Sequence, residues 1–343
     1  MKSFNLSLAI AAFAAFTLAS NLHAQPLVTI DTVTVGDVGN AADTTGYGAV
    51  ASEFAIGKYE VTISQYTTFL NSVAAVTSDS YIVDLWNAGM TTTASIAGIS
   101  RGGSGTLGDA YSYSVIGSGN RPMAYVSWFD AARFANWVNN GATVGASTET
   151  GAYTLNGATN GVGLAVNPGA TWFLPSLDQW YKAAYYKGGG TNAGYWLYPT
   201  QSDATPGNVV GGATNQANYR DDAGVFSVTQ STAVDFSQNY LTDVGAFSNS
   251  AGPYGTFDQA GNVWEWNDAV YDGSYRGIRG NSALDAARSS LMESSFNFGY
   301  GPPESEDQGI GFRLATVPEP STYALALMGA GALWLWRRRR AAP

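Results

Sequence analysis

The chain has 343 residues, with 26 acidic and 16 basic side chains and a net charge of −10. It contains no cysteine, and its single histidine is His23. Thiolate nucleophiles are therefore excluded, and imidazole bases and Cys/His zinc sites are excluded from any mature form that loses residue 23. The acidic balance also disfavours nucleic acid and anionic lipid as partners.

The N-terminal segment has the parts of a secretory signal peptide. Lys2 precedes an apolar stretch over residues 6–18, and Ala24 stands at the cleavage position before Gln25. A basic start, an apolar centre and a small residue at the cleavage site are typical of such peptides. We therefore expect residues 1–24 to be a signal peptide and the exported chain to lack histidine as well as cysteine.

Three helices are predicted from a hydroxyl residue followed three positions later by an acid or amide, which is the spacing of a capping box. Apolar residues then recur every three or four positions, so each helix has one apolar face that we expect to pack in the core. The three spacings are Thr62-x-x-Gln65, Ser127-x-x-Asp130 and Ser176-x-x-Gln179.

Strands are predicted over residues 53–59, 263–266 and 311–315 from their length and their alternating pattern. Stretches rich in Gly, Ser, Thr and Asn over residues 98–119, 139–167 and 201–252 predict long loops. Short helices, short strands and long loops together favour an α+β fold over a wound parallel sheet. We expect one domain over residues 25–316, because no change of composition marks a linker.

The C-terminal segment combines Val317-Pro-Glu-Pro320, an apolar run over residues 323–336 and four arginines, Arg337 to Arg340. The run is short for a stable membrane span of roughly 20 residues, and the arginines would keep this end in the cytoplasm. The segment 317–343 resembles the PEP-CTERM sorting signal. That resemblance implies transient anchoring in the inner membrane of a Gram-negative cell, cleavage by an exosortase-type enzyme, and delivery to the cell surface or extracellular matrix.

Six sequence blocks between Glu53 and Ala315 resemble those of the formylglycine-generating (sulfatase-modifying factor) enzymes, in the same order. They are Phe54 to Thr62, Arg121 to Ala131, Trp172 to Trp180, Gly261-Asn-Val-Trp-Glu-Trp266, Arg279-Gly-Asn-Ser282 and Gly311-Phe-Arg-Leu314. Phe173 stands where the family has an arginine, and Gln179 where it has a second acid. The resemblance implies a fold related to C-type lectins, loop-rich, with about three main helices.

A calcium site is expected at the signature strand. Asp258 and Glu265 offer carboxylates, and the turn before Val263 contains Gly261, whose backbone freedom lets carbonyls point inward. The resemblance implies that calcium is held by Asp258, the carbonyls of Gly261 and Val263, and Glu265. A weaker second site is implied at Asn218 and Tyr219. The alternative is that Glu265 forms an ion pair with Arg279 or Arg313 inside the fold.

The family's chemistry depends on two cysteines that hold copper and activate oxygen. The resemblance places Asp285 and Ser290 at those two positions. Neither side chain is a soft ligand for Cu(I), so no copper is expected. A related branch of iron-dependent sulfoxide synthases needs histidine ligands, which the exported chain lacks.

Two functional classes remain open. The first is an exported, non-catalytic protein of the surface or matrix that uses a calcium-stabilised, lectin-like scaffold to bind exopolysaccharide or protein. The second is an enzyme with divergent, cysteine-independent chemistry, in which Asp285 would act with Glu293 or Asp272 as a carboxylate pair.

Overall fold

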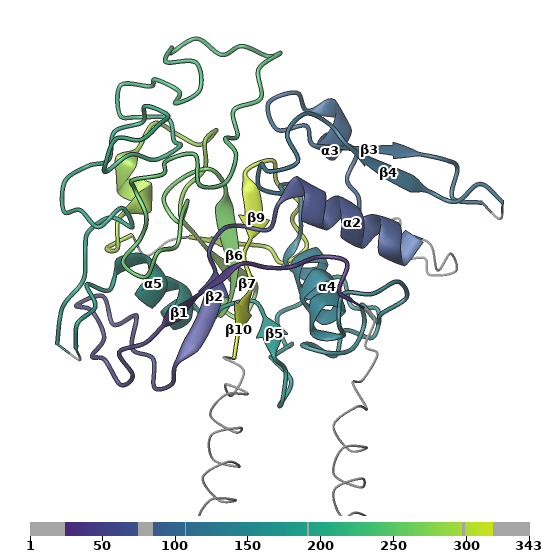
Figure 1. The fold of residues 1–343 in the computed structure, drawn as a ribbon, viewed down its shortest axis with the longest axis horizontal. Coiled ribbons are helices and arrows are strands. Elements are labelled where there is room, and N and C mark those ends of the chain that lie inside the picture. The colour runs from purple at the N-terminus through teal and green to yellow at the C-terminus, as the bar shows by residue number, and fades with distance from the viewer. Residues whose placement is uncertain (1–24, 75–84, 107, 191, 297–298, 318–343) are drawn as a thin grey trace, which may run out of the picture.

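The structure is a computed structural model that describes residues 25–74, 85–106, 108–190, 192–296 and 299–317 (Figure 1). The expected signal peptide and the expected sorting segment after Val317 lie outside these residues. Within them, no helix has the length and apolar character needed to cross a membrane.

The three predicted helices are confirmed, and each begins at its capping box. They are α2 (Ile63–Ala74), α4 (Trp128–Asn139) and α5 (Leu177–Tyr185). At the start of α4, Ser127 Oγ accepts from the backbone N–H of Asp130 at 3.1 Å, and Asp130 Oδ2 accepts from the backbone N–H of Ser127 at 2.9 Å. Such reciprocal bonds satisfy amide groups that have no partner inside the helix. Two short helical segments were not predicted, α3 (Gly89–Thr92) and the 3-10 segment η2 (Ser289–Met292).

Three small sheets make up the strand structure. The first has the order β1-β2-β10-β5, with all pairs antiparallel, and consists of β1 (Thr32–Val35), β2 (Phe54–Gly57), β10 (Ala315–Thr316) and β5 (Trp172–Phe173). The second is the hairpin of β3 (Ile99–Gly102) and β4 (Ser112–Val115). The third has the order β8-β7-β6-β9 and consists of β8 (Tyr300–Gly301), β7 (Tyr275–Arg279), β6 (Trp264–Tyr271) and β9 (Ile310–Phe312).

The strand predictions are right in place and wrong in length. The strand predicted over residues 53–59 shortens to β2, and the one over 263–266 extends to Tyr271 in β6. The one over 311–315 divides into β9 and β10, with Arg313 and Leu314 between them. The loop predicted over residues 98–119 is wrong because it contains the β3–β4 hairpin, whereas residues 139–167 and 201–252 contain no named helix or strand beyond the end of α4.

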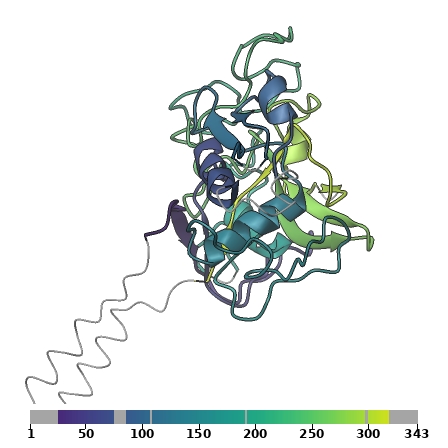
Figure 2. The same ribbon diagram turned by 90° about the vertical axis from the view of Figure 1, so that its right-hand side faces the viewer.

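The core is aromatic and lies between α2, α4 and β9. Phe134 of α4 packs edge-on against Phe69 of α2 with ring centroids 5.3 Å apart, and against Phe312 of β9 at 5.4 Å. In Figure 1, α2 and α4 lie to one side of β6 and β9, and α5 lies to the other. Figure 2 shows the β6–β7 hairpin and β1 at opposite edges of the body. The first half of β6 is therefore buried with helices on both sides, whereas its second half reaches the surface at Tyr271.

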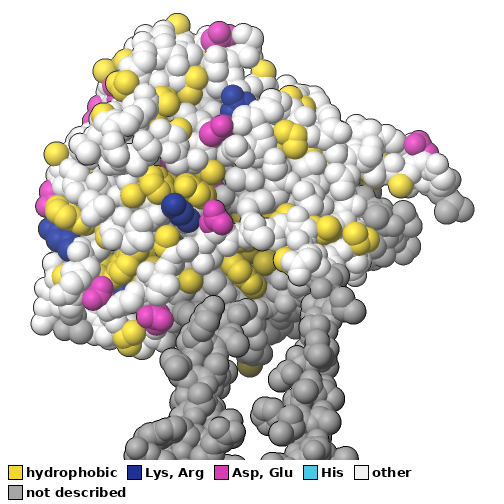
Figure 3. All heavy atoms as spheres, viewed as in Figure 1, with side chains coloured by type: hydrophobic (Ala, Val, Ile, Leu, Met, Phe, Trp, Pro, Cys, Tyr) yellow, Lys and Arg dark blue, Asp and Glu magenta, His cyan; other side chains and the backbone are white. Residues whose placement is uncertain are grey.

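The surface is mostly uncharged. On the face drawn in Figure 3, charged side chains are few and scattered, and neither sign forms a large patch. Broad electrostatic attraction does not define a binding surface on this face. Specific binding on this face would therefore depend on pockets and on clustered side chains.

Candidate functional site

The signature strand β6 sends its side chains to two sides. Trp266 donates its indole N–H to the carbonyl of Val126, just before α4, at 2.9 Å. Glu265 points the other way and accepts from the indole N–H of Trp180 in α5 at 2.8 Å. Alternation along a strand produces this division. The Trp-Glu-Trp sequence thereby ties the strand to both neighbouring helices.

The glycine of the signature turn is required by close packing. Gly261 has a φ of +85°, and a Cβ at this position would collide with the carbonyl oxygen of Asn218. That same carbonyl accepts from the backbone N–H of Asn262 at 2.7 Å. The two segments expected to bind calcium therefore lie side by side, joined through their backbones.

Of the two interpretations of Glu265, the structure shows the ion pair with Arg313. Arg313 donates from Nε to Glu265 Oε2 at 2.5 Å and from Nη2 to Oε1 at 2.6 Å, and both side chains are fully buried. The guanidinium also donates to the carbonyls of Gly57 and Phe257. Arg279, the other candidate partner, donates instead to the carbonyl of Phe296. A two-point arginine–carboxylate pair of this kind is strong and holds a defined orientation.

Two further carboxyl groups surround this ion pair. Glu60 Oε2 lies 4.0 Å from Arg313 Nη2, and neither oxygen of Glu60 has a hydrogen-bond partner. Burial, reinforced by the charge of Asp258, raises the pKa of Glu60 well above its ordinary value. Burial also raises the pKa of Asp258 to about 6, against the opposing effects of its Gly245 hydrogen bond and of Arg313. We call Glu60, Asp258, Glu265 and Arg313 the buried charge cluster.

The buried charge cluster holds three carboxyl groups and one guanidinium, so its acidic groups outnumber its basic group. Burial lowers the pKa of Arg313, but the charge and hydrogen bonds of Glu265 outweigh burial and raise the pKa above its ordinary value. The arginine therefore stays charged and neutralises one carboxylate. The excess is relieved by a proton on Glu60 or by a further cation.

The expected calcium ligands fit a hard cation in chemical type. Asp258 Oδ2 accepts from the backbone N–H of Gly245 at 2.6 Å, and Glu265 Oε1 accepts a single bond from Arg313. A carboxylate oxygen has two acceptor positions, so both side chains keep a lone pair. Across the described part of the chain, no three Asp, Glu, His or Cys side chains converge on a metal position. A calcium ion here would depend on two carboxylates and the carbonyls of Gly261 and Val263.

The weaker second site is more fully occupied by internal bonds. The Nδ2 of Asn218 donates to the carbonyl of Tyr240 at 3.0 Å and to Asn262 Oδ1 at 2.9 Å. The carbonyl of Tyr219 accepts from Ser227 Oγ at 3.1 Å. These bonds account for the burial of both residues without a metal ion.

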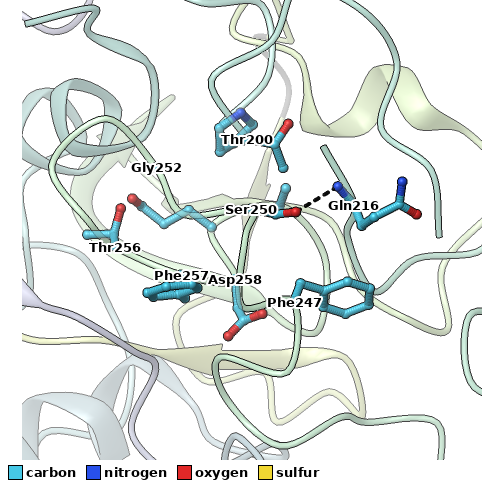
Figure 4. A pocket seen from close by; sticks show the side chains of 11 residues that line it. Thr200, Gln216, Phe247, Ser250, Gly252, Thr256, Phe257 and Asp258 are labelled. Carbon is cyan, nitrogen blue, oxygen red and sulfur yellow. Dashed lines mark hydrogen bonds between the residues drawn. The ribbon is translucent and has the colours of Figure 1, made fainter. Parts of the chain in front are cut away.

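A small cavity of about 10 Å³ adjoins Asp258, which forms part of its lining (Figure 4). The carboxylate of Asp258 points away from Thr200 and Ser250, and Ser250 accepts from the backbone N–H of Gln216 at 2.9 Å. The hydroxyl of Thr256, also in the lining, is buried without a partner. A void of this size holds about one water molecule, which would satisfy Thr256.

An open groove of about 290 Å³ lies on the side of the signature strand that Trp264 faces. Asp285 lies in it and accepts from the indole N–H of Trp264 at 2.5 Å. Its lining residues come from β6, β7 and the segments after them: Trp264, Ile278, Ser282, Leu284, Asp285, Asp307, Gln308, Gly309 and Ile310. We call it the Asp285 groove.

The two positions that match the family's cysteines differ in their surroundings. Asp285 lines the groove, whereas Ser290 lies in η2, is exposed and is not part of the lining. The carboxylates expected beside Asp285 lie elsewhere. Glu293 accepts from the hydroxyl of Tyr198 at 2.9 Å, and Asp272 lies in the exposed β6–β7 turn. The carboxylate that shares the groove is Asp307.

Two of these residues carried no signal in the sequence. Glu60 stands between β2 and α2 in a Tyr-Glu-Val-Thr run and could not be assigned to a cluster of residues around position 260. Asp307 belongs to a polar stretch, Glu304 to Gln308, that is typical of an exposed loop. Only the paired strands β6 and β9 bring this stretch back beside Trp264.

These features define an α+β scaffold whose signature strand is held by a buried ion pair on one face and borders an open groove on the other. The Sulfatase-modifying factor enzyme 1-like domain family matches residues 32–317, and the chain belongs to that family. The PEP-CTERM protein-sorting motif matches residues 316–340. That motif marks the protein for export, exosortase processing and sorting to the cell surface. No curated protein matches the chain.

Three solved structures are similar to this chain at low sequence identity. CarF is 21% identical over 85% of this chain and 100% of its own, with a TM-score of 0.48. Treponema denticola variable protein 1 is 20% identical over 85% and 96%, with a TM-score of 0.48. PvdO from Pseudomonas aeruginosa is 16% identical over 84% and 92%, with a TM-score of 0.37.

Proposed function

We propose that this protein is a non-catalytic binding protein of the cell surface or extracellular matrix, with exopolysaccharide as its ligand. The observation that carries the proposal is the Asp285 groove. It is open, yet the position that holds a cysteine in the family's enzymes has Asp285, bonded to an indole. We infer from the resemblance that the chain keeps the place of the family's active site and replaces its reactive group.

The groove lining suits a sugar. Asp285, Asp307, Ser282 and Gln308 supply carboxylate, hydroxyl and amide groups around the apolar edges of Ile278 and Leu284. Pockets for small ligands combine a few placed polar groups with apolar walls. Trp264 is 8% exposed, so it positions Asp285 through its N–H and offers little surface for stacking. Recognition therefore depends on hydrogen bonds to sugar hydroxyls.

The test is retention of the producer's own exopolysaccharide and of a broad glycan array by the purified chain. We expect Asp285→Asn and Asp307→Asn each to weaken retention about tenfold, in line with the loss of one charged hydrogen bond. Asp272→Asn is the matched control, because Asp272 is an exposed aspartate of the β6–β7 turn. No retention by the unmodified chain, or equal retention by all three variants, would contradict the proposal.

The alternative is a divergent enzyme with cysteine-independent chemistry, which the presence of Asp285 and Asp307 in one groove favours. Two carboxyl groups flanking a glycosidic bond can hydrolyse it. A retained polysaccharide incubated with the chain should then release new reducing ends, and Asp285→Ala should stop the release. Retention without any release favours the binding protein.

We also propose that calcium stabilises the signature turn through Asp258, the carbonyls of Gly261 and Val263, and Glu265. The support is the excess of buried carboxyl groups over Arg313 and the lone pairs left on Asp258 and Glu265. When bound, calcium would supply positive charge to the buried charge cluster. The protein residues orient the turn through Gly261 and the Arg313 ion pair.

Calcium binding is tested by thermal unfolding in calcium and in chelator. A ligand that binds only the folded state raises the unfolding temperature by mass action. We expect a higher melting temperature in calcium, and we expect Asp258→Asn to reduce the difference while Asp272→Asn leaves it unchanged. The same melting temperature in calcium and chelator would remove the metal from the proposal and leave the Asp285 groove untouched.

A further inference from the structure

The small cavity beside Asp258 contains two buried polar side chains without partners. Thr256 and Gln259 both belong to its lining, and they are 1% and 2% exposed. Neither Thr256 Oγ1 nor Gln259 Oε1 forms a hydrogen bond with any residue that the structure describes. Buried side-chain polar atoms nearly always have a partner, so two such atoms in one lining mark a binding position. We call this space the Thr256 cavity.

The amide of Gln259 is held in one orientation. Its Nε2 donates to the carbonyl of Trp180 in α5 at 3.1 Å. The opposite orientation would set two oxygen acceptors against each other and lose this bond. Gln259 Oε1 is therefore left to face the cavity, where it needs a hydrogen-bond donor.

Gly252 leaves open the position that an occupant would take (Figure 4). Its φ lies outside the left-handed region that favours glycine, so a side chain is excluded here by space and not by backbone conformation. A Cβ on Gly252 would lie 2.6 Å from Thr256 Oγ1, and 3.4 and 3.5 Å from the carbonyl oxygens of Pro199 and Ala183. Ala183 lies in the last turn of α5, where carbonyl oxygens have no partner inside the helix. Three oxygen atoms therefore surround one open position.

The lining favours water over a metal ion. Asp258 is the one acidic residue in the described lining, and its carboxylate accepts from the backbone N–H of Gly245. The other oxygen atoms around the position are neutral. The hydroxyl of Thr256 can donate, whereas Gln259 Oε1 can only accept, so the occupant has to accept one bond and donate another. A water molecule does both, and a buried water typically makes about three hydrogen bonds.

We propose that one bound water molecule occupies the Thr256 cavity as a fixed part of the fold. It accepts from the Thr256 hydroxyl and donates to Gln259 Oε1 and to the carbonyl of Ala183. The water thereby joins the turn that contains Asp258 to the last turn of α5, in addition to the direct bond from Gln259 to Trp180. The proposal depends on neither the sugar ligand nor calcium.

The direct test is a crystal structure of the purified full chain, grown with rubidium chloride in place of sodium salts. We expect one density peak within about 2.5–3.0 Å of Thr256 Oγ1, Gln259 Oε1 and the carbonyl oxygen of Ala183, without an anomalous signal from rubidium. An empty cavity overturns the proposal. A peak with a rubidium signal also overturns it, because the occupant would then be a monovalent cation.

A substitution gives a second test in solution. Thr256→Val keeps the shape of the side chain and removes the hydroxyl. With a water molecule present, the water loses its donor, and the melting temperature should fall by about 2–4 °C, the shift expected from one hydrogen bond. In a dry cavity the same change would remove an unpaired buried hydroxyl and raise the melting temperature.

Two further variants complete the test. Thr232→Val is the matched control, because Thr232 is exposed and should tolerate the change without a shift. Gly252→Ala places a methyl group in the position of the water, and its crystal structure should show no peak there. A melting temperature that Thr256→Val leaves unchanged or raises overturns the proposal, as does a peak that persists in Gly252→Ala.

Discussion

Asp258 and Asp285 lie on either side of the same signature strand and have opposite surroundings. Asp258 belongs to a cluster in which every charged side chain is buried and the partners are protein atoms. Asp285 opens into a groove, where its carboxylate accepts from the indole N–H of Trp264 and from the backbone N–H of Ala286. The same residue type therefore belongs to the buried scaffold on one face of the strand and opens into a groove on the other face.

The largest expected effect on stability comes from removing the cation of the buried charge cluster. Arg313→Met leaves three buried carboxyl groups without a counter-charge, and breaking such a pair typically costs about 3–5 kcal/mol of unfolding free energy. Urea unfolding measures the loss. Arg288→Met at an exposed position should be near neutral, and a similar small effect for both variants would show that the cluster does not carry the scaffold.

The next effect is a dependence on pH. The folded state raises the pKa of Asp258 from 3.8 to about 6 and raises that of Glu60. Between the unfolded and folded pKa of each group, the folded chain holds a proton that the unfolded chain has released. The contribution of these two groups to stability is therefore largest below about pH 4 and falls as pH rises through about 6. Urea midpoints in chelator from pH 4.5 to 8 measure the slope, which Asp258→Asn should make shallower. A slope that this substitution leaves unchanged would assign the titration to other groups.

A smaller effect is expected from the donor on the opposite side of the ion pair. Trp180→Phe removes the indole N–H that Glu265 Oε2 accepts at 2.8 Å, and bonds to charged groups contribute about 1.5–3 kcal/mol. The loss should appear as a lower urea midpoint. Trp196→Phe is the control, because that indole is half-buried over Lys187. Equal losses for the two variants would mean that ring size, not the hydrogen bond, is what matters.

The smallest effect on stability is expected at the groove. Asp285→Asn keeps an oxygen for the Trp264 indole, so the free energy of unfolding should change by no more than about 0.5 kcal/mol, even though ligand retention falls. The comparison holds if stability and retention separate in this way. A loss of stability as large as that of Trp180→Phe would make Asp285 a part of the scaffold.

The helices were predictable because their signals are local. The capping boxes at Ser127 and Ser176 lie within four residues and form as the spacing indicates. The β3–β4 hairpin was missed because its strands contain Arg101 and several serines and lie within a Gly-rich stretch. A pattern of alternating apolar residues cannot reveal strands that have few apolar side chains to bury.

The site residues were predictable only where interacting residues are near in sequence or where a position matches a motif of the family. The choice between calcium and an ion pair at Glu265 stayed open because Arg313 lies 48 residues away in sequence. Only the fold determines which arginine lies beside Glu265. Asp285 was found by its place after Arg279. The position of its groove partner Asp307 depends on the pairing of β9 with β6, two strands distant in sequence, which spacing does not report.

The last strands of the domain complete both larger sheets. β10 lies between β2 and β5, and β9 pairs in parallel with β6, while Arg313 between them is the counter-ion of Glu265 and lies near Glu60. A chain that crosses a membrane from its N-terminus presents these residues late. Until they emerge, the first sheet lacks its centre and the carboxyl groups lack their cation. The order of the strands therefore delays completion of both sheets until almost all of the domain is across.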